Sequence, residues 1–340
     1  MKSFADLLIA WHAKSGRHHL PWQQSKDPYS VWVSEIMLQQ TQVTTVIDYY
    51  NRFMKKFPTI KALANADEEE VMQLWSGLGY YRRARFLHEG AQMIMEEMEG
   101  VFPSQFDMMM KIPGIGRSTA GAISAFSFNQ KKAILDGNVK RVLSRYFLIT
   151  QWTGLPKTEK KLWDYAESLL PDKNIATYTQ ALMDLGATIC NKKPVCESCP
   201  LKKTCLAFQK NKVYLVPAPR PHKKIPTETT HMVIIKHHDE VLLIKRPQGG
   251  IWGGLWSLPQ YEGQAATSKA WIKKHFGLET SLIEKDLKAS TTFTHYKLDI
   301  TYSILEAKSQ RAKSPHTWLS INTLEGAAIP AIIRKILLKL

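Results

Sequence analysis

The chain has 340 residues, and 46 Lys and Arg against 30 Asp and Glu give it a net charge of +16. This positive excess favours a polyanionic partner, which is nucleic acid or, less often, an anionic membrane surface. The hydrophobic fraction of 44% is that of a globular protein, and no run approaches the ~18 apolar residues of a membrane span. We therefore expect a monomeric, cytoplasmic protein with about two domains and no membrane partner.

Helical patterns fill the first domain, which we place at residues 1–212. The N-terminal segment has no small-residue cleavage site and predicts a first amphipathic helix. Further along, apolar residues recur with helical spacing, and proline or glycine separates most of the segments. The predicted helical segments are 29–57, 67–99, 104–112, 118–127, 138–148, 158–170 and 174–190.

A glycine-rich turn, Pro113-Gly114-Ile115-Gly116, lies between two of the predicted helices. Two glycines let backbone N–H groups approach a ligand closely, and the helix that follows presents the positive end of its dipole. Such a turn can hold a phosphate without reading a base, although it can equally be an ordinary corner between helices. The basic segment downstream favours the phosphate interpretation.

All four cysteines lie within sixteen residues, with the spacing Cys-x5-Cys-x2-Cys-x5-Cys. Disulfides suit oxidising compartments, and a four-cysteine zinc site usually has two short Cys pairs. The wide outer gaps therefore favour an iron–sulfur cluster over zinc, and a metal over disulfides. Residues 190–224 also hold nine Lys or Arg and one acidic residue, so a metal would fix basic loops beside each other for phosphate binding. The four candidate ligands are Cys190, Cys196, Cys199 and Cys205.

Prolines in 213–227 predict an extended linker, and the pattern changes after it. Residues 228–340 predict a second domain of the α+β class, because short β-branched and aliphatic runs alternate with helical patterns. We expect a hairpin of 231–236 with 240–245, strands at 255–259, 290–293 and 298–305, and helices near 266–276 and 328–340.

A set of specific motifs extends over nearly the whole chain: SEIMLQQTQV (34–43), GLGYYRRAR (77–85), IPGIGRSTAGAI (112–123), LDGNVKRV (135–142), ALMDLGATIC (181–190) and the cysteine loop at 190–205. Together they resemble the helix–hairpin–helix DNA glycosylase superfamily, in its endonuclease III branch, and more narrowly the adenine DNA glycosylase (MutY) family. The first gap of the cysteine loop is one residue shorter than is usual there.

This resemblance implies an all-α helix–hairpin–helix glycosylase domain with a four-cysteine iron–sulfur loop holding a [4Fe–4S] cluster, followed by an α+β Nudix-like (MutT-like) domain. The implied substrate is double-stranded DNA in which adenine is mispaired with 8-oxoguanine or guanine. The implied activity is an adenine-specific DNA glycosylase of base excision repair.

Cleavage of an adenine N-glycosidic bond needs a proton for the base and negative charge near the sugar, which two carboxyl groups in different environments can supply. Glu35 stands among apolar residues that would raise its pKa, and it matches the family's catalytic acid. Asp136 would cap the next helix and so stay ionised; by resemblance it stabilises the oxocarbenium ion or forms a transient adduct. By the same resemblance Asn138 positions the sugar or the water. The alternative to a catalytic role is a surface position on an amphipathic helix for Glu35 and a purely structural helix cap for Asp136.

The resemblance also implies DNA contacts. In bifunctional relatives a lysine occupies the place of Ser118 and forms a Schiff base, so the serine predicts base removal without efficient strand cleavage. Gln40 and Tyr80 match an intercalating pair. The other implied contacts are Thr41 and Leu78 at the orphan base, Gly114 and Gly116 of the hairpin, and Gln180 at the adenine edge.

The second domain is expected to have a binding role and no nucleotide pyrophosphatase activity. A Nudix hydrolase needs a run of acids for Mg²⁺, and the corresponding SKAWIKKHFGL (268–278) has lysines instead. Phe293, Thr294 and His295 match the family's loop that senses 8-oxoguanine, with threonine in place of its serine.

Two other functions stay open on the sequence. One is a bifunctional, endonuclease III-like glycosylase and lyase for oxidised pyrimidines. The other is a non-catalytic iron–sulfur protein that binds DNA. The sequence identifies no replication or mismatch-repair partner.

Overall fold

The computed structural model describes residues 3–221, 224–261, 268–312 and 316–340. These residues form two compact units. The first unit contains the chain up to Ala66 and from Arg85 into the proline-rich segment. The second contains Asp67–Ala84 together with the chain after that segment. A stretch in the middle of the helical sequence thus belongs to the same unit as the C-terminal residues.

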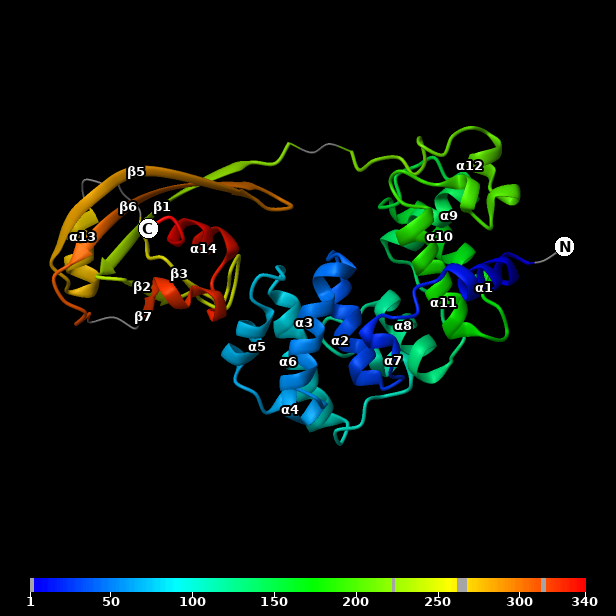
Figure 1. Ribbon diagram of the computed structural model, residues 1–340, viewed down its shortest axis with the longest axis horizontal. Helices are drawn as coiled ribbons and strands as arrows, with labels where there is room; N and C mark the ends of the chain where they lie inside the picture. The colour runs from blue at the N-terminus through cyan, green and yellow to red at the C-terminus, as the bar shows by residue number, and fades with distance from the viewer. Residues whose placement is uncertain (1–2, 222–223, 262–267, 313–315) are drawn as a thin grey trace. The chain divides into compact units, whose positions relative to one another are not determined.

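The first unit is helical (Figure 1). Helix α6 begins in the second unit and continues into the first. The helices are α1 (Phe4–Ser15), α2 (Pro28–Leu38), α3 (Val43–Lys56), α4 (Ile60–Ala64), α6 (Arg82–Glu97), α7 (Phe106–Met109), α8 (Arg117–Phe128), α9 (Gly137–Tyr146), α10 (Pro156–Ser168), α11 (Ile175–Asp184) and α12 (Leu206–Gln209), with the short helices η1 (Pro21–Gln23), η2 (Leu185–Ile189), η3 (Cys196–Ser198) and η4 (Lys202–Thr204).

Polar side chains fix where several of these helices begin. At α1, Ser3 and Asp6 form a capping box in which each side-chain oxygen accepts the other residue's backbone N–H, at 3.1 and 3.0 Å. At α2, Asp27 accepts from the N–H of Ser30 at 2.9 Å, and Pro28 occupies the first helical position. These caps satisfy N–H groups that have no partner inside the helix.

Two predicted helical segments are each divided by a turn. The prediction of one helix over 29–57 is wrong, because a turn separates α2 from α3 and Gln40 within it has a left-handed φ of 58°. No proline or glycine marks that turn in the sequence. The predicted segment 67–99 contains a pair of glycines, Gly77 and Gly79, which have φ of 95° and 78° and separate α5 (Glu68–Trp75) from α6.

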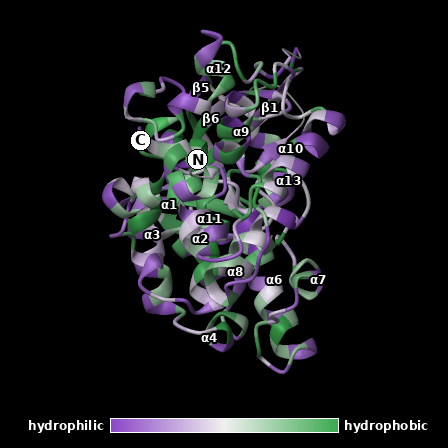
Figure 2. Ribbon diagram, turned by 90° about the vertical axis from the view of Figure 1, so that its right-hand side faces the viewer, coloured by the Kyte–Doolittle hydropathy of each residue, from purple (hydrophilic) through white to green (hydrophobic). Residues whose placement is uncertain are grey.

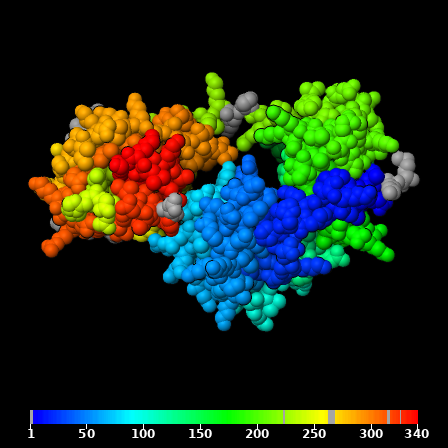
Figure 3. Space-filling model, in the orientation of Figure 1, coloured from blue at the N-terminus to red at the C-terminus, as the bar shows by residue number. Residues whose placement is uncertain are grey.

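Amphipathic helices bury their apolar faces against one another in the first unit. Helix α1 packs on α11 and α2 packs on α8. Figure 3 shows α1, in dark blue, against the green part of the chain that contains α11. One buried cluster joins Leu8 of α1, Leu182 of α11 and Leu143 of α9. Hydrophobic and hydrophilic residues alternate along the helices of Figure 2, as this packing requires.

The second unit contains a mixed sheet whose strands follow the order β3-β2-β1-β6-β5. The predicted hairpin is confirmed, because β1 and β2 pair antiparallel; β6 lies parallel to β1 on its other side. The strands are β1 (Thr227–His237), β2 (Glu240–Lys245), β3 (Trp256–Ser257), β4 (Gln260–Tyr261), β5 (Thr280–Thr292), β6 (Lys297–Ala307) and β7 (Thr317–Ser320), and the helices are α13 (Ser268–Phe276), η6 (Ile321–Gly326) and α14 (Ala331–Leu337).

The central strand β1 is buried on both faces. Met232 and Ile234 belong to a cluster with Ile333 of α14, whereas Val233 and Ile235 point into a cluster with Ile272 of α13. Successive strand side chains alternate between faces, so a continuous apolar run is what a two-sided core needs. Most of β5 was missed in the sequence, because its first half is exposed and irregular and so lacks a regular apolar alternation.

None of the helices in the described ranges is both long and apolar enough to cross a membrane.

Close packing at Gly121 of α8 gives a stability test. A Cβ at this position would lie 2.2 Å from the carbonyl oxygen of Ala133, which is backbone and cannot rotate away. We expect Gly121→Ala to lower the free energy of unfolding by about 1–3 kcal/mol through overpacking. Chemical denaturation measures this loss. Gly116→Ala is the matched control, since no atom lies within 4 Å of a Cβ there. Equal stability of the two variants would contradict the packing argument.

Candidate active site

Glu35 lies on α2 in a strongly apolar setting. Its neighbours Trp32, Val33 and Ile36 are buried, and Glu35 as a whole residue is half-buried. Burial, and to a smaller extent the charge of Asp136, together raise the pKa of Glu35 to about 8. At neutral pH this side chain is therefore a protonated acid.

Asp136 is the N-cap of α9. One carboxylate oxygen accepts from the N–H of Val139 at 2.8 Å, and the other accepts from Asn138 Nδ2 at 3.1 Å. Burial raises the pKa of Asp136, while these bonds and the nearby Arg141 guanidinium act against that rise. The two carboxyl groups are close enough to interact, and only Asp136 has donors that stabilise its ionised form. Asp136 therefore ionises first, and its charge opposes ionisation of Glu35.

Arg141 connects Asp136 to the cysteine loop, which the sequence alone did not indicate. Its guanidinium donates to Asn138 Oδ1 at 2.8 Å and to the carbonyl oxygen of Cys190 at 2.7 Å. A further bond at 2.6 Å reaches the carbonyl of Gly186. A continuous hydrogen-bonded path therefore runs from Cys190 through Arg141 and Asn138 to Asp136.

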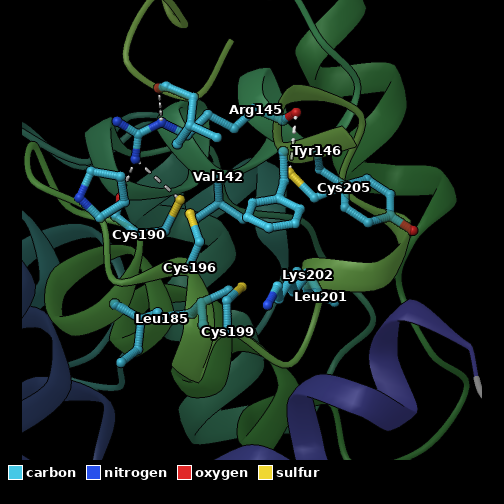
Figure 4. A pocket seen from close by; sticks show the side chains of 14 residues that line it. Val142, Arg145, Tyr146, Leu185, Cys190, Cys196, Cys199, Leu201, Lys202 and Cys205 are labelled. Atoms are coloured by element: carbon cyan, nitrogen blue, oxygen red, sulfur yellow. Dashed lines mark hydrogen bonds between the residues drawn. The ribbon is translucent and has the colours of Figure 1, made fainter. Parts of the chain in front are cut away.

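The four cysteines surround one apolar pocket (Figure 4). Val142, Tyr146 and Leu185 complete much of its lining. Arg145 donates to Cys190 Sγ at 3.3 Å and to the carbonyl oxygen of Asn191 at 2.7 Å. All four cysteines are free thiols in the structure, so the disulfide alternative receives no support.

Burial raises the pKa of the Cys199 thiol to about 12, so this group ionises only where a cation replaces its proton. Within the described part of the chain, no three Cys, His, Asp or Glu side chains converge closely enough to hold one metal ion. The sulfur atoms are instead distributed around the pocket. Four thiols around one pocket form a donor set that fits a metal centre, either zinc or an iron–sulfur cluster.

The predicted hairpin is formed by α7, a turn and α8. Gly114 has a left-handed φ of 79°, and Gly116 is the N-cap of α8. Ser118 lies in the first turn of α8, where its Oγ accepts the backbone N–H of Leu135 at 3.0 Å. This bond fixes the chain immediately before Asp136. The serine therefore has a structural contact that sequence reasoning did not anticipate.

Gln40 and Tyr80, the two residues expected to intercalate, both have left-handed backbones, with φ of 58° and 49°. Non-glycine residues rarely adopt this conformation, and strain of this kind is often found at functional sites. Tyr80 is 53% exposed, whereas Leu78 beside it is buried. Thr41 follows Gln40, and its hydroxyl donates to the carbonyl of Gln39 at 3.3 Å. A large exposed aromatic ring at a constrained turn is suited to contact with a partner.

Gln180 belongs to a buried polar network on α11. Its Nε2 donates to Asp184 Oδ1 at 2.9 Å. The same carboxylate is wholly buried, pairs with Arg17 at 2.6 Å and lies 3.3 Å from His12 Nε2. The bonds from His12 and Arg17 outweigh burial and lower the pKa of Asp184. Arg17, His12 and Asp184 were missed in the sequence, because no short spacing connects positions so far apart.

In the second unit, Phe293, Thr294 and His295 follow β5 in the tight connection to β6. The N–H of Phe293 donates to the carbonyl of Tyr296 at 2.8 Å, and the Phe293 ring lies 5.6 Å from that of Trp252. Thr294 and His295 are exposed. The loop therefore anchors an aromatic ring and presents a hydroxyl and an imidazole. Helix α13 carries Lys273, Lys274 and His275 in its last turn.

Comparisons with known proteins agree with this architecture. Residues 33–168 match the model of the HhH-GPD superfamily of base excision DNA repair proteins, and residues 230–339 match that of the NUDIX domain. The chain is 39% identical over 339 residues to the adenine DNA glycosylase of Buchnera aphidicola subsp. Acyrthosiphon pisum, covering 98% of this chain and 96% of that protein. The chain belongs to the adenine DNA glycosylase family. The human family member is 31% identical, over 98% of this chain and 73% of its own length.

Solved structures resemble the helical part of this family member. A thermostable thymine-DNA glycosylase has a TM-score of 0.56 and 29% identity, over 61% of this chain and 95% of its own. An endonuclease III solved in a non-covalent DNA complex shares the fold, with a TM-score of 0.52 and 21% identity over 61% of this chain and 94% of its own. The expected helix–hairpin–helix fold is thus confirmed.

The raised pKa of Glu35 predicts how stability depends on pH. Between its ordinary value and about 8, the folded protein holds a proton that the unfolded chain has released, so stability falls as pH rises through this range. Glu35→Gln removes that loss. We expect its melting temperature to exceed that of the wild type at pH 8 and to match it near pH 4. Glu97→Gln, at an exposed position, is the control, and a constant difference at all pH values would contradict the shift.

Proposed function

We propose that this chain removes adenine mispaired with 8-oxoguanine or guanine from double-stranded DNA by hydrolysing the N-glycosidic bond. The observation that carries the proposal is the pairing of a protonated Glu35 with an N-capping Asp136 in one partly buried site. Family membership supports the same chemistry. The reaction needs a proton for the base and a negative charge near the sugar, and a protonated Glu35 with an ionised Asp136 would supply them.

Glu35 is proposed as the general acid. Adenine leaves readily only after a ring nitrogen gains a proton, and a carboxyl group with a pKa of about 8 holds that proton at physiological pH. The bond between the base nitrogen and the sugar carbon then breaks with its electron pair on the base. The deoxyribose ring is left with oxocarbenium character.

Asp136 is proposed to stabilise that positive charge, either electrostatically or through a transient covalent bond that water later displaces. Its orientation depends on the N–H of Val139 and on Asn138, which Arg141 holds in turn. Asn138 thereby positions the sugar or the attacking water. The attacking water finally supplies the hydroxyl of the sugar product.

Binding of the duplex is assigned to exposed and constrained elements. Backbone N–H groups at Gly114 and Gly116 can hold a phosphate, since a helix N-terminus attracts anions. Tyr80 and Gln40 would fill the space left by the extruded adenine, with Leu78 and Thr41 at the orphan base. Gln180, whose side chain is held by its hydrogen bond to Asp184, would contact the edge of the adenine base. The Phe293-Thr294-His295 loop would recognise 8-oxoguanine.

The cysteine pocket is proposed to hold a [4Fe–4S] cluster through Cys190, Cys196, Cys199 and Cys205. When bound, the cluster would stabilise the loop that carries it. Exposed lysines of this loop, such as Lys192, Lys193 and Lys203, would then lie on a fixed surface for phosphates. Arg141 and Arg145 bind the backbone of the loop from α9.

A bifunctional lyase is disfavoured by Ser118. Schiff-base chemistry needs a nucleophilic amine at the hairpin helix, and the serine hydroxyl is instead engaged with the N–H of Leu135. We therefore infer a monofunctional enzyme.

The activity is tested by single-turnover release of adenine from duplexes containing A:8-oxoG, A:G or A:T. We expect release from the two mismatches, and a loss of at least about 100-fold in Glu35→Gln, because general acids contribute about 10²–10⁴-fold. Glu97→Gln is the matched control. Near-normal release by Glu35→Gln would refute the acid assignment, and mismatch binding without release would favour the non-catalytic alternative. Stoichiometric borohydride trapping on oxidised pyrimidines would favour the lyase.

The cofactor is tested by spectroscopy of the purified protein. We expect a brown colour with broad visible absorbance, and iron with acid-labile sulfide in equal amounts. Cys199→Ser should lose both and melt at a lower temperature. A colourless protein that contains zinc would contradict the proposal, because Zn²⁺ has no d-electron absorption.

A further inference from the structure

The turn that carries Tyr80 is bonded to the C-terminal segment of the second unit. Ser76 Oγ donates to the carbonyl of Ala327 at 2.9 Å and accepts from Arg334 at 2.5 Å. At the other end of the turn, the Tyr81 hydroxyl donates to the carbonyl of Ile329 at 3.3 Å. The same hydroxyl accepts the N–H of Gly77 at 3.2 Å. Both ends of the turn are therefore attached to residues 327–334.

A second set of bonds holds the turn from within. Trp75 Nε1 and a guanidinium nitrogen of Arg83 both donate to the carbonyl of Gly79, each at 3.1 Å. The Arg83 guanidinium lies 5.5 Å from the centre of the Tyr80 ring. Arg83 is buried, and burial lowers its pKa to about 10, so it stays charged at neutral pH. These contacts orient the backbone at Gly79, immediately before Tyr80.

Helix α5, which leads into the turn, also forms hydrogen bonds and an ion pair with strands β2 and β3. Glu69 accepts from Trp256 Nε1 at 2.7 Å and from Lys245 Nζ at 3.4 Å. The segment from Glu68 to Tyr81 is therefore attached at its helix and at both ends of its turn.

These hydrogen bonds hold the turn in a backbone conformation that is energetically unfavourable at Tyr80. Gly77, Gly79 and Tyr80 all have left-handed backbones, a conformation that costs energy at the tyrosine. An aromatic ring entering a base stack must also resist displacement, and a preorganised ring loses less conformational entropy on binding. A turn with three such residues keeps its shape only if surrounding bonds determine it.

We propose that the second domain positions the side chain of Tyr80 through hydrogen bonds from Ser76 and Tyr81 to the 327–334 segment. We call this side chain the Tyr80 wedge, because it would enter the base stack. Ser76 and Tyr81 are thus positioning residues that act through Tyr80. The inference rests on the proposed function, in which Tyr80 enters the duplex. The second domain would then contribute to adenine excision opposite guanine as well as opposite 8-oxoguanine. A domain that only read 8-oxoguanine would leave excision opposite guanine unaffected.

The test uses the full chain and Tyr81→Phe, which removes the bridging hydroxyl and keeps the ring. The hydroxyl makes two hydrogen bonds, so we expect single-turnover excision to fall at least about 3- to 10-fold, the value of a single bond, on both A:8-oxoG and A:G. Ser76→Ala should act in the same direction. Tyr165→Phe is the matched control, a half-buried tyrosine of α10 far from these contacts in sequence.

A double-mutant cycle separates positioning from general damage. If Tyr81 acts through the wedge, Tyr80→Ala with Tyr81→Phe should be no slower than Tyr80→Ala alone. Multiplied losses, a wild-type rate for Tyr81→Phe, or a loss confined to A:8-oxoG would each overturn the inference.

Unstacking is also measurable without chemistry, by the fluorescence of 2-aminopurine placed beside the mismatch in a bound duplex. Tyr81→Phe should show a smaller increase than the wild type. An equal increase would overturn the inference. Absence of adenine release by the wild-type protein would instead refute the proposed function, and the fluorescence would still decide the role of Tyr81.

Discussion

The proposed chemistry depends on two neighbouring carboxyl groups that both lose hydration and differ in the donors they receive. Both side chains lose hydration, yet only Asp136 receives backbone and amide donors in return. Glu35 therefore keeps its proton, and a negative charge nearby makes that proton harder to lose. Two residues of similar intrinsic acidity thus differ in protonation state, because Asp136 caps a helix and Glu35 lies among apolar side chains.

Helix α9 connects this pair to the cysteine loop. Asp136 caps its N-terminus, while Arg141 and Arg145, four residues apart, project toward the carbonyl groups of the loop. Residues at this spacing share one face of a helix, so a single rigid element links the carboxylate to the four thiols. Hydrogen bonds of Arg141 and Asn138 join the backbone of the cysteine loop to Asp136. The same geometry explains why two basic residues are half-buried or buried in a protein whose other positive charges are mostly exposed.

The second structural theme is backbone strain at exposed turns. Gln40 and Tyr80 both adopt left-handed conformations, and the turn of Tyr80 is held by neighbours from distant parts of the sequence. Strain of this kind persists only where other contacts determine it. The unit to which Asp67–Ala84 belongs therefore matters for the proposed role of Tyr80, because contacts that hold this turn come from the C-terminal residues.

The sequence by itself determined the helical and α+β regions, the hairpin of β1 and β2, the hairpin glycines and the candidate cysteines, because these depend on local periodicity, turn residues and spacing. It also identified Glu35 and Asp136 by resemblance. Their unequal ionisation was also expected from the sequence, whereas only the tertiary structure decided that the two carboxyl groups interact, and it alone revealed the Arg141 path, the Asp184 network and the attachment of Ser76 and Tyr81. Each of these joins side chains separated by many residues, and burial or pairing at such distances leaves no periodic signal along the chain. The turn at Gln40 was missed for a related reason, since a left-handed glutamine has no marker comparable to glycine.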